Sequence, residues 1–357
     1  SWAGTVVVDA AGGGNATSIQ AGINMAANGD VVQVNSGTYV ENLDFGGRTI
    51  TVEGRDGAAS TFVVGTGVGP VVRIDSAEGA GTTLRGLTIS GGNVVGYTDT
   101  NESGGGVFVN EVPVVLEDLV LTGNSAKFGG GLMVSGAISG SISNCVLENN
   151  SATSGGNLYV YGGSVTLDGV LLQGGTAGAT GVDGYGGGSV FYGASVTAEN
   201  VEWSSNTATK YGGGHYAYGG DLSCTACTWT GNTATSGGGA WFSGQQLDLL
   251  RSEVSSNTAT QNGGGLALSE GTTQVDRVLL ESNTASYGAG MVLLGGSLSG
   301  PGFWARSNLA AGGGGGIYND GGSLELWNAL FESNVAAGAN GGGIGLDGGI
   351  ATVSGSI

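Results

Sequence analysis

A short phrase recurs along most of this chain and constrains its fold more than any other feature. The phrase is an aliphatic or aromatic residue, two variable residues, an asparagine and, a few residues later, a run of glycines. The asparagine slots fall at positions 124, 150, 175, 206, 232, 257, 283, 308 and 334, in steps of 26, 25, 31, 26, 25, 26, 25 and 26 residues. A period this strict predicts a solenoid, in which each repeat buries its apolar face against its neighbours.

The apolar residues before each asparagine predict the cross-section of one repeat. Two pairs of apolar positions precede Asn206, namely Val196/Ala198 and Val201/Trp203. The members of a pair are two apart, so they face one side of a strand, and the polar residues between the pairs indicate a corner. A third strand is expected after the glycines. The sequence therefore predicts an all-β parallel β-helix of about a dozen rungs, with three short strands in each rung.

The recurring asparagine is expected to line one corner and to stack on its counterpart in the next rung, at about 4.8 Å. Its amide can donate to the next rung and accept from the previous one, so the row satisfies itself. Gly92 and Gly175 replace the asparagine in two rungs, and in both the following turn is longer by about six residues. The predicted structural ladder comprises Asn124, Asn150, Asn206, Asn232, Asn257, Asn283, Asn308 and Asn334.

Residues 1–65 lack the repeat and are expected to form an N-terminal cap, followed by the repeat β-helix over residues 66–357. The segment 17–27 predicts a short helix, with Thr17 or Ser18 as N-cap and Ile19 and Ile23 on one face. A cap is needed because the first rung exposes apolar side chains and unpaired strand edges. Residues 350–357 show no such cover, so we expect either further protein beyond them or end-to-end assembly into filaments.

Two resemblances follow from these residues. The N-terminal segment resembles the cap of pectin-lyase-like β-helix proteins, which implies a right-handed solenoid. The repeats, over roughly residues 84–350, resemble the FxxN and GGA[ILV] repeats of polymorphic outer-membrane proteins and autotransporter-type adhesins. Phe331-Glu-Ser-Asn334 has the FxxN form, whereas most other repeats begin with Leu, Trp or Val. The resemblance implies a secreted or cell-surface protein with an adhesin-like role.

The charge composition excludes some classes of partner. The net charge is −19, with only 9 Lys and Arg, which argues against nucleic acid and anionic membranes. No apolar run approaches 18 residues, so we expect no membrane-spanning helix. The chain opens at Ser1 without a basic and apolar leader, as a processed secreted protein would. Together with the abundance of Gly, Thr, Ser and Asn, these features predict an extracellular or cell-surface location.

Catalytic residues are not evident in the repeats. Enzymes on β-helices carry paired carboxylates or clustered Asp and Arg on one outer face. Stacking the repeats gives no such cluster: Arg251 and Arg277 beside Asp248 and Asp276 come nearest, and we interpret them as surface ion pairs. The cap also resembles that of pectin methylesterases, without their catalytic Gln, Asp and Arg motifs. We therefore expect a non-enzymatic protein; the alternative is a polysaccharide-binding or polysaccharide-degrading β-helix enzyme.

Aromatic residues recur at the outward positions of the strand after the glycines. An exposed aromatic ladder can stack against sugar rings or a protein partner, whereas its structural alternative is to stabilise pairs between rungs. We predict a binding face for a glycan or protein. Its residues are Phe108, Met133, Tyr159, Tyr161, Tyr192, Tyr216, Tyr218 and Trp241.

The cysteines and the one histidine are expected to be structural. Cys224 and Cys227 occupy inward slots on both sides of a corner, which is compatible with a local disulfide or with simple core packing. Cys145 takes the same slot as Cys227 three rungs earlier, too far to pair. His215 cannot form a metal site alone, so we expect it to be packed. No cofactor is expected.

Two weaker hypotheses concern the turns. Threonines at 207/209, 233/235, 258/260 and Thr284/Ser286 form an array that resembles ice-binding faces, although a corner before a glycine run would be narrow and curved. Residues 99–102 and the loop around Asp183 contain several oxygen ligands and could hold calcium, at a spacing that matches no defined loop.

Overall fold

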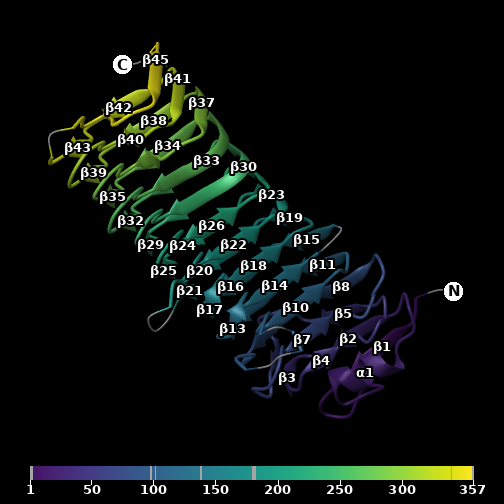
Figure 1. The fold of residues 1–357 in the computed structure, drawn as a ribbon. Helices are drawn as coiled ribbons and strands as arrows, with labels where there is room; N and C mark the ends of the chain where they lie inside the picture. The colour runs from purple at the N-terminus through teal and green to yellow at the C-terminus, as the bar shows by residue number, and fades with distance from the viewer. Residues whose placement is uncertain are drawn as a thin grey trace.

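The fold is an elongated parallel β-helix with one short helix at its N-terminal end (Figure 1). The computed structural model describes residues 3–96, 99–100, 102–136, 139–178, 182–338 and 340–355. Within these residues, parallel strands stack in register into three sheets of 24, 12 and 9 strands, here called sheets A, B and C. Within the described residues, no helix is both long and apolar enough to cross a membrane.

From residue 107 to residue 336, each rung passes through the sheets in a fixed order: two limbs of sheet A, one strand of sheet B and one of sheet C. The first limb of sheet A comprises β4 (Leu43–Asp44), β7 (Val72–Ile74), β10 (Val107–Asn110), β14 (Leu132–Ser135), β18 (Leu158–Tyr161), β22 (Ser189–Tyr192), β26 (His215–Tyr218), β30 (Ala240–Leu250), β33 (Leu266–Asp276), β36 (Met291–Leu293), β40 (Ile317–Asn319) and β44 (Ile344–Leu346). Its second limb comprises β1 (Thr5–Val8), β2 (Val31–Val34), β5 (Thr51–Gly54), β8 (Thr82–Arg85), β11 (Val114–Glu117), β15 (Gly140–Ser143), β19 (Ser164–Asp168), β23 (Ser195–Glu199), β27 (Asp221–Thr225), the later parts of β30 and β33, β37 (Ser297–Pro301), β41 (Ser323–Trp327) and β45 (Ile350–Ser354).

Sheets B and C are built from shorter strands. Sheet B comprises β3 (Gly37–Val40), β6 (Thr61–Val64), β9 (Thr88–Ser90), β12 (Val120–Thr122), β16 (Val146–Glu148), β20 (Leu171–Gln173), β24 (Glu202–Ser204), β28 (Thr228–Thr230), β31 (Glu253–Ser255), β34 (Val278–Glu281), β38 (Phe303–Arg306) and β42 (Leu330–Glu332). Sheet C comprises β13 (Ser125–Phe128), β17 (Ser151–Ser154), β21 (Thr176–Ala177), β25 (Thr207–Ala208), β29 (Thr233–Ala234), β32 (Thr258–Ala259), β35 (Thr284–Ala285), β39 (Leu309–Ala310) and β43 (Val335–Ala336).

The sides of the solenoid differ from the sequence-based assignment in one respect. The strand after the glycines was expected to be separated by a corner from the strand that follows it. Instead both belong to sheet A, and in β30 and β33 they run on as single strands of 11 residues. The third side comes from the short strands between the asparagine and the glycines, because alternating Thr-Ala pairs bury alanine inward and leave threonine outward there.

The N-terminal helix α1 (Ile19–Met25) lies against the first strands of sheet A (Figure 1). Its N-cap is Ser18, whose hydroxyl accepts from the backbone N–H of Ala21 at 3.3 Å. The carboxylate of Glu41 accepts from the N–H groups of Ile19 and Gln20 at 2.7 and 2.9 Å, since the first turn of a helix offers these groups no partner of its own. The buried face of the helix covers the apolar end of the solenoid, as the exposed first rung requires. Sheets A and B continue past the boundary expected between residues 65 and 66, because β5 pairs with β8 and β6 pairs with β9.

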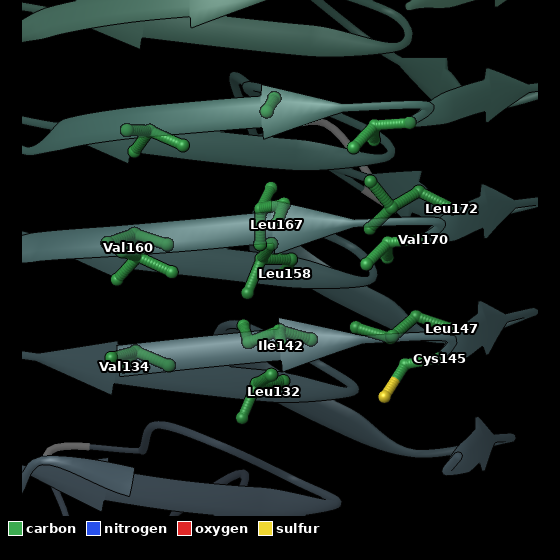
Figure 2. Close-up of a cluster of buried hydrophobic side chains, with 14 of the residues drawn as sticks. Leu132, Val134, Ile142, Cys145, Leu147, Leu158, Val160, Leu167, Val170 and Leu172 are labelled. Atoms are coloured by element: carbon green, nitrogen blue, oxygen red, sulfur yellow. The ribbon is translucent and has the colours of Figure 1, made fainter. Parts of the chain in front are cut away.

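The core is a column of aliphatic side chains in which like stacks on like. Figure 2 shows Leu132, Ile142 and Leu147 of one rung below Leu158, Leu167 and Leu172 of the next. All six are at most 1 % exposed. A buried leucine contributes about 1.5–3 kcal/mol through burial of apolar area, so the column is the main favourable contribution to folding. Trp203 and Trp229 continue it as parallel rings 4.7 Å apart.

The asparagines form a continuous hydrogen-bonded row at the corner between sheets B and C. Asn206 donates from its backbone N–H and from Nδ2 to Oδ1 of Asn232, at 2.9 and 3.0 Å, and its Nδ2 also donates to the carbonyl of Leu172 at 2.8 Å. The residue before the asparagine takes the left-handed conformation, for example Ser205 at φ 55°. The same pattern runs without a break from Asn206 to Asn334.

Asn157 repairs the gap in the row at Gly175. It comes from a glycine slot in the preceding turn, and its Oδ1 accepts from the backbone N–H and Nδ2 of Asn150 at 3.3 and 3.0 Å. Its Nδ2 donates to Oδ1 of Asn206 at 3.2 Å, which reconnects the row. At the other gap, the N–H of Gly92 donates to Oδ1 of Asn124 at 2.9 Å, and the row ends there.

Candidate functional site

Aromatic side chains gather on the outer surface along the corner between sheet C and the first limb of sheet A. They form three rows parallel to the axis of the solenoid, because the strands that carry them pair in register. The surface extends over six rungs from β10 to β30, about 24 Å at the spacing of parallel strands. We call this surface the aromatic trough.

The floor of the trough comes from the first outward position of each strand in the first limb of sheet A. Phe108 and Tyr159 are each 8 % exposed although they face away from the core, because the flanking rows cover them. Burial raises the pKa of the Tyr159 hydroxyl, and it raises that of Tyr216 to about 12. These phenols therefore stay protonated and neutral at physiological pH. The floor comprises Phe108, Met133, Tyr159, Val190, Tyr216 and Trp241.

One wall of the trough is a stack of exposed tyrosines, two residues further along the same strands. Tyr161, Tyr192 and Tyr218 are 51, 40 and 48 % exposed. Their rings are nearly parallel, with centroids 5.5 Å apart in the first pair and 5.2 Å in the second. Side chains that stack in this way lose little freedom when a ligand binds, because each ring already limits its neighbours.

The opposite wall comes from residues directly before the glycine turns, and the sequence analysis missed it. Phe128 packs edge-on against Tyr159, with centroids 5.4 Å apart. Tyr185 lies 5.1 Å from Tyr216, and Tyr211 lies nearly parallel to Trp241 at 4.3 Å. The signal was present in the sequence, since an aromatic residue precedes a glycine triplet in each case.

The two rungs that lack the ladder asparagine supply loops to the trough. The longer turn after Gly92 brings Asp99, Thr100 and Ser103 to one end, and the longer turn after Gly175 leads into Tyr185 of the wall. Asp183 in the second turn pairs with Lys210, which raises the pKa of the lysine. The interruptions of the ladder therefore coincide with the loops that shape this surface.

Two hollows lie in the trough and share Tyr159. The first has a volume of about 530 Å³ and is lined by Asp75, Asp99, Thr100, Ser103, Phe108, Asn110, Phe128, Met133, Ser135, Tyr159 and Tyr161. The second has a volume of about 280 Å³ and is lined by Ser154, Tyr159, Tyr185, Val190, Tyr192, Tyr216 and Tyr218. Polar and aromatic residues share the lining of the first hollow, whereas the second is lined mainly by aromatic residues. Apolar and aromatic surface with placed polar groups is typical of ligand sites.

Asp75 and Asp99 both line the first hollow, and Arg73 pairs with Asp75 next to it; the sequence analysis did not find this group. Nε of Arg73 lies 2.7 Å from Oδ2 of Asp75, whose side chain is only 10 % exposed. Asp99 belongs to the longer turn, so its place could not be obtained by stacking repeats of equal length. The pair expected to come nearest to such a cluster, Arg277 and Asp276, is a surface ion pair at 3.0 Å with both side chains 40 % exposed or more.

The remaining predicted residues lie away from the trough or serve the core. His215 is fully buried, 2.8 Å from the hydroxyl of Ser189, and burial lowers its pKa to about 3. Cys224 and Cys227 form a disulfide with Cα atoms 5.9 Å apart, and Cys145 is a free buried thiol whose pKa burial raises to about 12.

The first threonine of each pair in the predicted array lies on sheet C, and the second residue follows the strand in the turn. Thr207, Thr233, Thr258 and Thr284 pair in register and are exposed. In the last two strands Leu309 and Val335 take their place. Ice binding through this array stays a prediction that a measurement of thermal hysteresis would test.

No group of three or more His, Cys, Asp or Glu side chains within the described part of the chain is arranged to hold a metal ion. The candidate calcium loop at 99–102 includes Asn101, which lies outside the described residues.

The sequence matches no protein-family model and no curated protein. Among solved structures, the chain is similar to the siphovirus 9NA tailspike receptor binding domain, with a TM-score of 0.39 and 10 % identity over 99 % of this chain and 76 % of that one. It is also similar to pectin methylesterase from carrot, with a TM-score of 0.27 and 12 % identity over 97 % of this chain and 88 % of that one. At these values neither similarity assigns a ligand or an activity, so the chain is defined by its own geometry as a parallel β-helix protein with an outer aromatic trough.

Proposed function

We propose that this protein is a non-enzymatic, extracellular or cell-surface protein that binds an extended polysaccharide along its aromatic trough. The observation that carries the proposal is the trough itself: a mainly aromatic floor over six rungs, flanked along part of its length by aromatic residues on both sides. Sugar rings present flat C–H faces that pack well on aromatic rings, while Tyr hydroxyls can hydrogen-bond the sugar hydroxyls. A linear ligand suits a linear trough, because the rungs that carry the aromatic side chains repeat at a constant step.

The exposure of the tyrosine wall supports binding over a purely structural role. Three large aromatic side chains in a row, each at least 40 % exposed, keep apolar area in water that a partner would cover. The acidic composition and the abundance of Gly, Thr, Ser and Asn agree with an extracellular location, where polysaccharides are available. Assembly into filaments stays a prediction from the sequence.

The test is a binding assay on a panel of linear polysaccharides, by affinity electrophoresis and isothermal titration calorimetry. The informative variant is Tyr192→Ala/Tyr218→Ala, since both rings are exposed and their loss should leave the fold intact. We expect binding to weaken about tenfold or more, because two stacking contacts are removed. Trp327→Ala is the matched control, an aromatic residue of similar exposure outside the trough. Binding that survives the tyrosine variant but fails in the control would contradict the proposal.

One observation favours the alternative function, cleavage of the bound polysaccharide. Asp75 and Asp99 line the same hollow as the aromatic residues, and paired carboxylates are the usual groups for glycoside hydrolysis. The same panel distinguishes the two functions when product is assayed as newly formed reducing ends. Cleavage that disappears in Asp75→Asn would replace binding as the function, whereas tight binding without product supports the non-enzymatic role.

A further inference from the structure

The first hollow of the trough differs chemically from the second. Its lining adds the carboxylates of Asp75 and Asp99 and the hydroxyls of Thr100 and Ser103 to the aromatic residues, and no Lys or Arg lines either hollow among the described residues. Resting on the proposed function, we infer that this end of the trough selects neutral, hydroxyl-rich sugar chains and rejects chains that carry carboxylates or sulfates.

The carboxylate of Asp75 is held in place as an acceptor. Arg73 fixes Oδ2 from one side at 2.7 Å, and the hydroxyl of Ser76 donates to Oδ1 at 3.4 Å. Arg73 pairs in register with Phe108 of the floor, so Asp75, two residues on, reaches the level of Asn110. An ionised carboxylate accepts hydrogen bonds and donates none, and its bonds to donors are stronger than neutral ones. Sugar hydroxyls are such donors, whereas a uronate carboxylate offers only acceptors of the same charge.

Thr100 provides a second observation that points to a ligand. Its side chain is 3 % exposed and lines the first hollow, yet its Oγ1 has no hydrogen-bond partner in the protein. Buried polar groups are almost always paired, so an orphaned hydroxyl at a hollow indicates a partner that arrives from outside. A hydroxyl both donates and accepts, which suits the hydroxyl of a neutral sugar.

The cations around the trough do not offset this preference. Lys127 and Lys210 lie over the rings of Phe128 and Tyr185 in the opposite wall. Each lysine is paired with a carboxylate, Glu102 and Asp183 respectively. Arg73 is held by Asp75 in the same way. With a net charge of −19 on the whole chain, an anionic polymer meets repulsion at long range and finds no unpaired cation lining the hollows.

The experiment compares sugars that differ only at C6, where the neutral member carries a hydroxymethyl group and the uronate a carboxylate. Cello-oligosaccharides are paired with their C6-oxidised cellouronates, and carboxyl-reduced oligogalacturonate with native oligogalacturonate, so that length and linkage are matched within each pair. We expect the wild type to bind the neutral member about tenfold more tightly in at least one pair, as one charge-assisted hydrogen bond is worth. Equal or tighter binding of the uronate member in both pairs, or no binding to any of the four, would overturn the inference.

Three variants separate recognition from folding. Asp75→Asn should reduce the ratio of the affinities for the neutral and uronate members about tenfold. Glu325→Gln makes an equal change of charge at an exposed strand position outside the trough and should leave this ratio unchanged. Thr100→Val should weaken neutral binding about fivefold without lowering the unfolding midpoint, because its hydroxyl has no partner to lose. If the wild type binds glycans of the earlier panel but Asp75→Asn leaves the ratio unchanged, this inference fails while the proposed function stands; absence of all glycan binding refutes both.

Discussion

The corner between sheets B and C is built differently in the two halves of the solenoid. From Asn206 to Asn334 every rung has its asparagine, a tight turn and a short strand of sheet C. In the N-terminal half, Gly92 and Gly175 interrupt the row, and the longer turns that replace it shape the aromatic trough. The difference teaches that a ladder asparagine goes with a tight turn, whereas both breaks carry longer turns that reach the trough. The break at Gly175 is closed by Asn157, and at Gly92 the row ends.

Removing an asparagine from the unbroken half should have the largest effect. In Asn257→Ala, the backbone N–H and Nδ2 of Asn232 lose their acceptor, and the carbonyl of Trp229 loses a donor. Since these groups are buried, the free energy of unfolding should fall by about 3–5 kcal/mol. The measurement is urea-induced unfolding followed by tryptophan fluorescence and circular dichroism.

Asn124→Ala is the comparison at the broken end of the row. There the amide oxygen accepts only from the N–H of Gly92, so fewer buried groups are left without partners. We expect a loss smaller by about 1 kcal/mol than in Asn257→Ala. Equal losses at the two sites would show that the unbroken ladder is no more demanding than its end.

The period made most of the fold predictable, because it fixes which residues stack. Strand positions in sheet B and the second limb of sheet A follow from pairs such as Val201/Trp203, and the floor of the trough follows from outward aromatic residues such as Tyr159. Sheet C was missed because two-residue strands carry almost no periodic signal.

The rest of the site depends on exceptions to the repeat. Asn157 occupies a glycine slot, and its role appears only when the turn at Gly175 is seen to bring it beside Asn206. Asp99 lies in an inserted turn, whose path no neighbouring rung dictates. Residues of this kind are set by tertiary packing, so a repeat alignment cannot place them.

Acid should weaken the molecule at the junction between the two halves, where His215 packs among Phe191, Trp203 and Phe242. Burial lowers its pKa to about 3, whereas an unfolded histidine titrates near 6.5. Between these values the unfolded state binds more protons, so stability falls as the pH falls through that window. At pH 4.5 this contribution amounts to about 3 kcal/mol relative to pH 7.5.

The measurement is the free energy of unfolding of the wild type and of His215→Gln between pH 4 and pH 8. Carboxylates also titrate over this range, and the difference between the two proteins removes their contribution because both share them. We expect the wild type to lose more stability than the variant on acidification. If the free energies of unfolding of the two proteins fell equally with pH, the imidazole would take up its proton as readily in the folded state as in the unfolded state.

Exchanging Asn157 and Gly175, the two residues at the repaired gap, should have the smallest effect on stability. The exchange tests whether the asparagine row is packed in the same way in both halves of the solenoid. In a regular rung, a Cβ on the third glycine of the turn would lie close to the ladder amide, as Gly214 does at 3.0 Å from Nδ2 of Asn232. At the gap the identities are reversed: Asn157 fills the glycine slot, and a Cβ on Gly175 would lie 2.6 Å from its Nδ2. In the regular rung and at the gap alike, a single side-chain amide therefore fills the space between the ladder position and the third glycine position.

Asn157→Gly should lose the acceptor of Asn150, and Gly175→Asn should clash with Asn157, so each single variant should be destabilised. In the double variant the amide at 175 can take the vacated space, and the two changes should be less costly together than in sum by about 2 kcal/mol. The double variant should still be less stable than the wild type, because the carbonyl of Gly187 would lie only 2.3 Å from the new Cβ. Urea unfolding of all four proteins gives the coupling directly. Effects that add to within about 0.5 kcal/mol would mean that the two slots are independent and that the gap is not a repaired ladder.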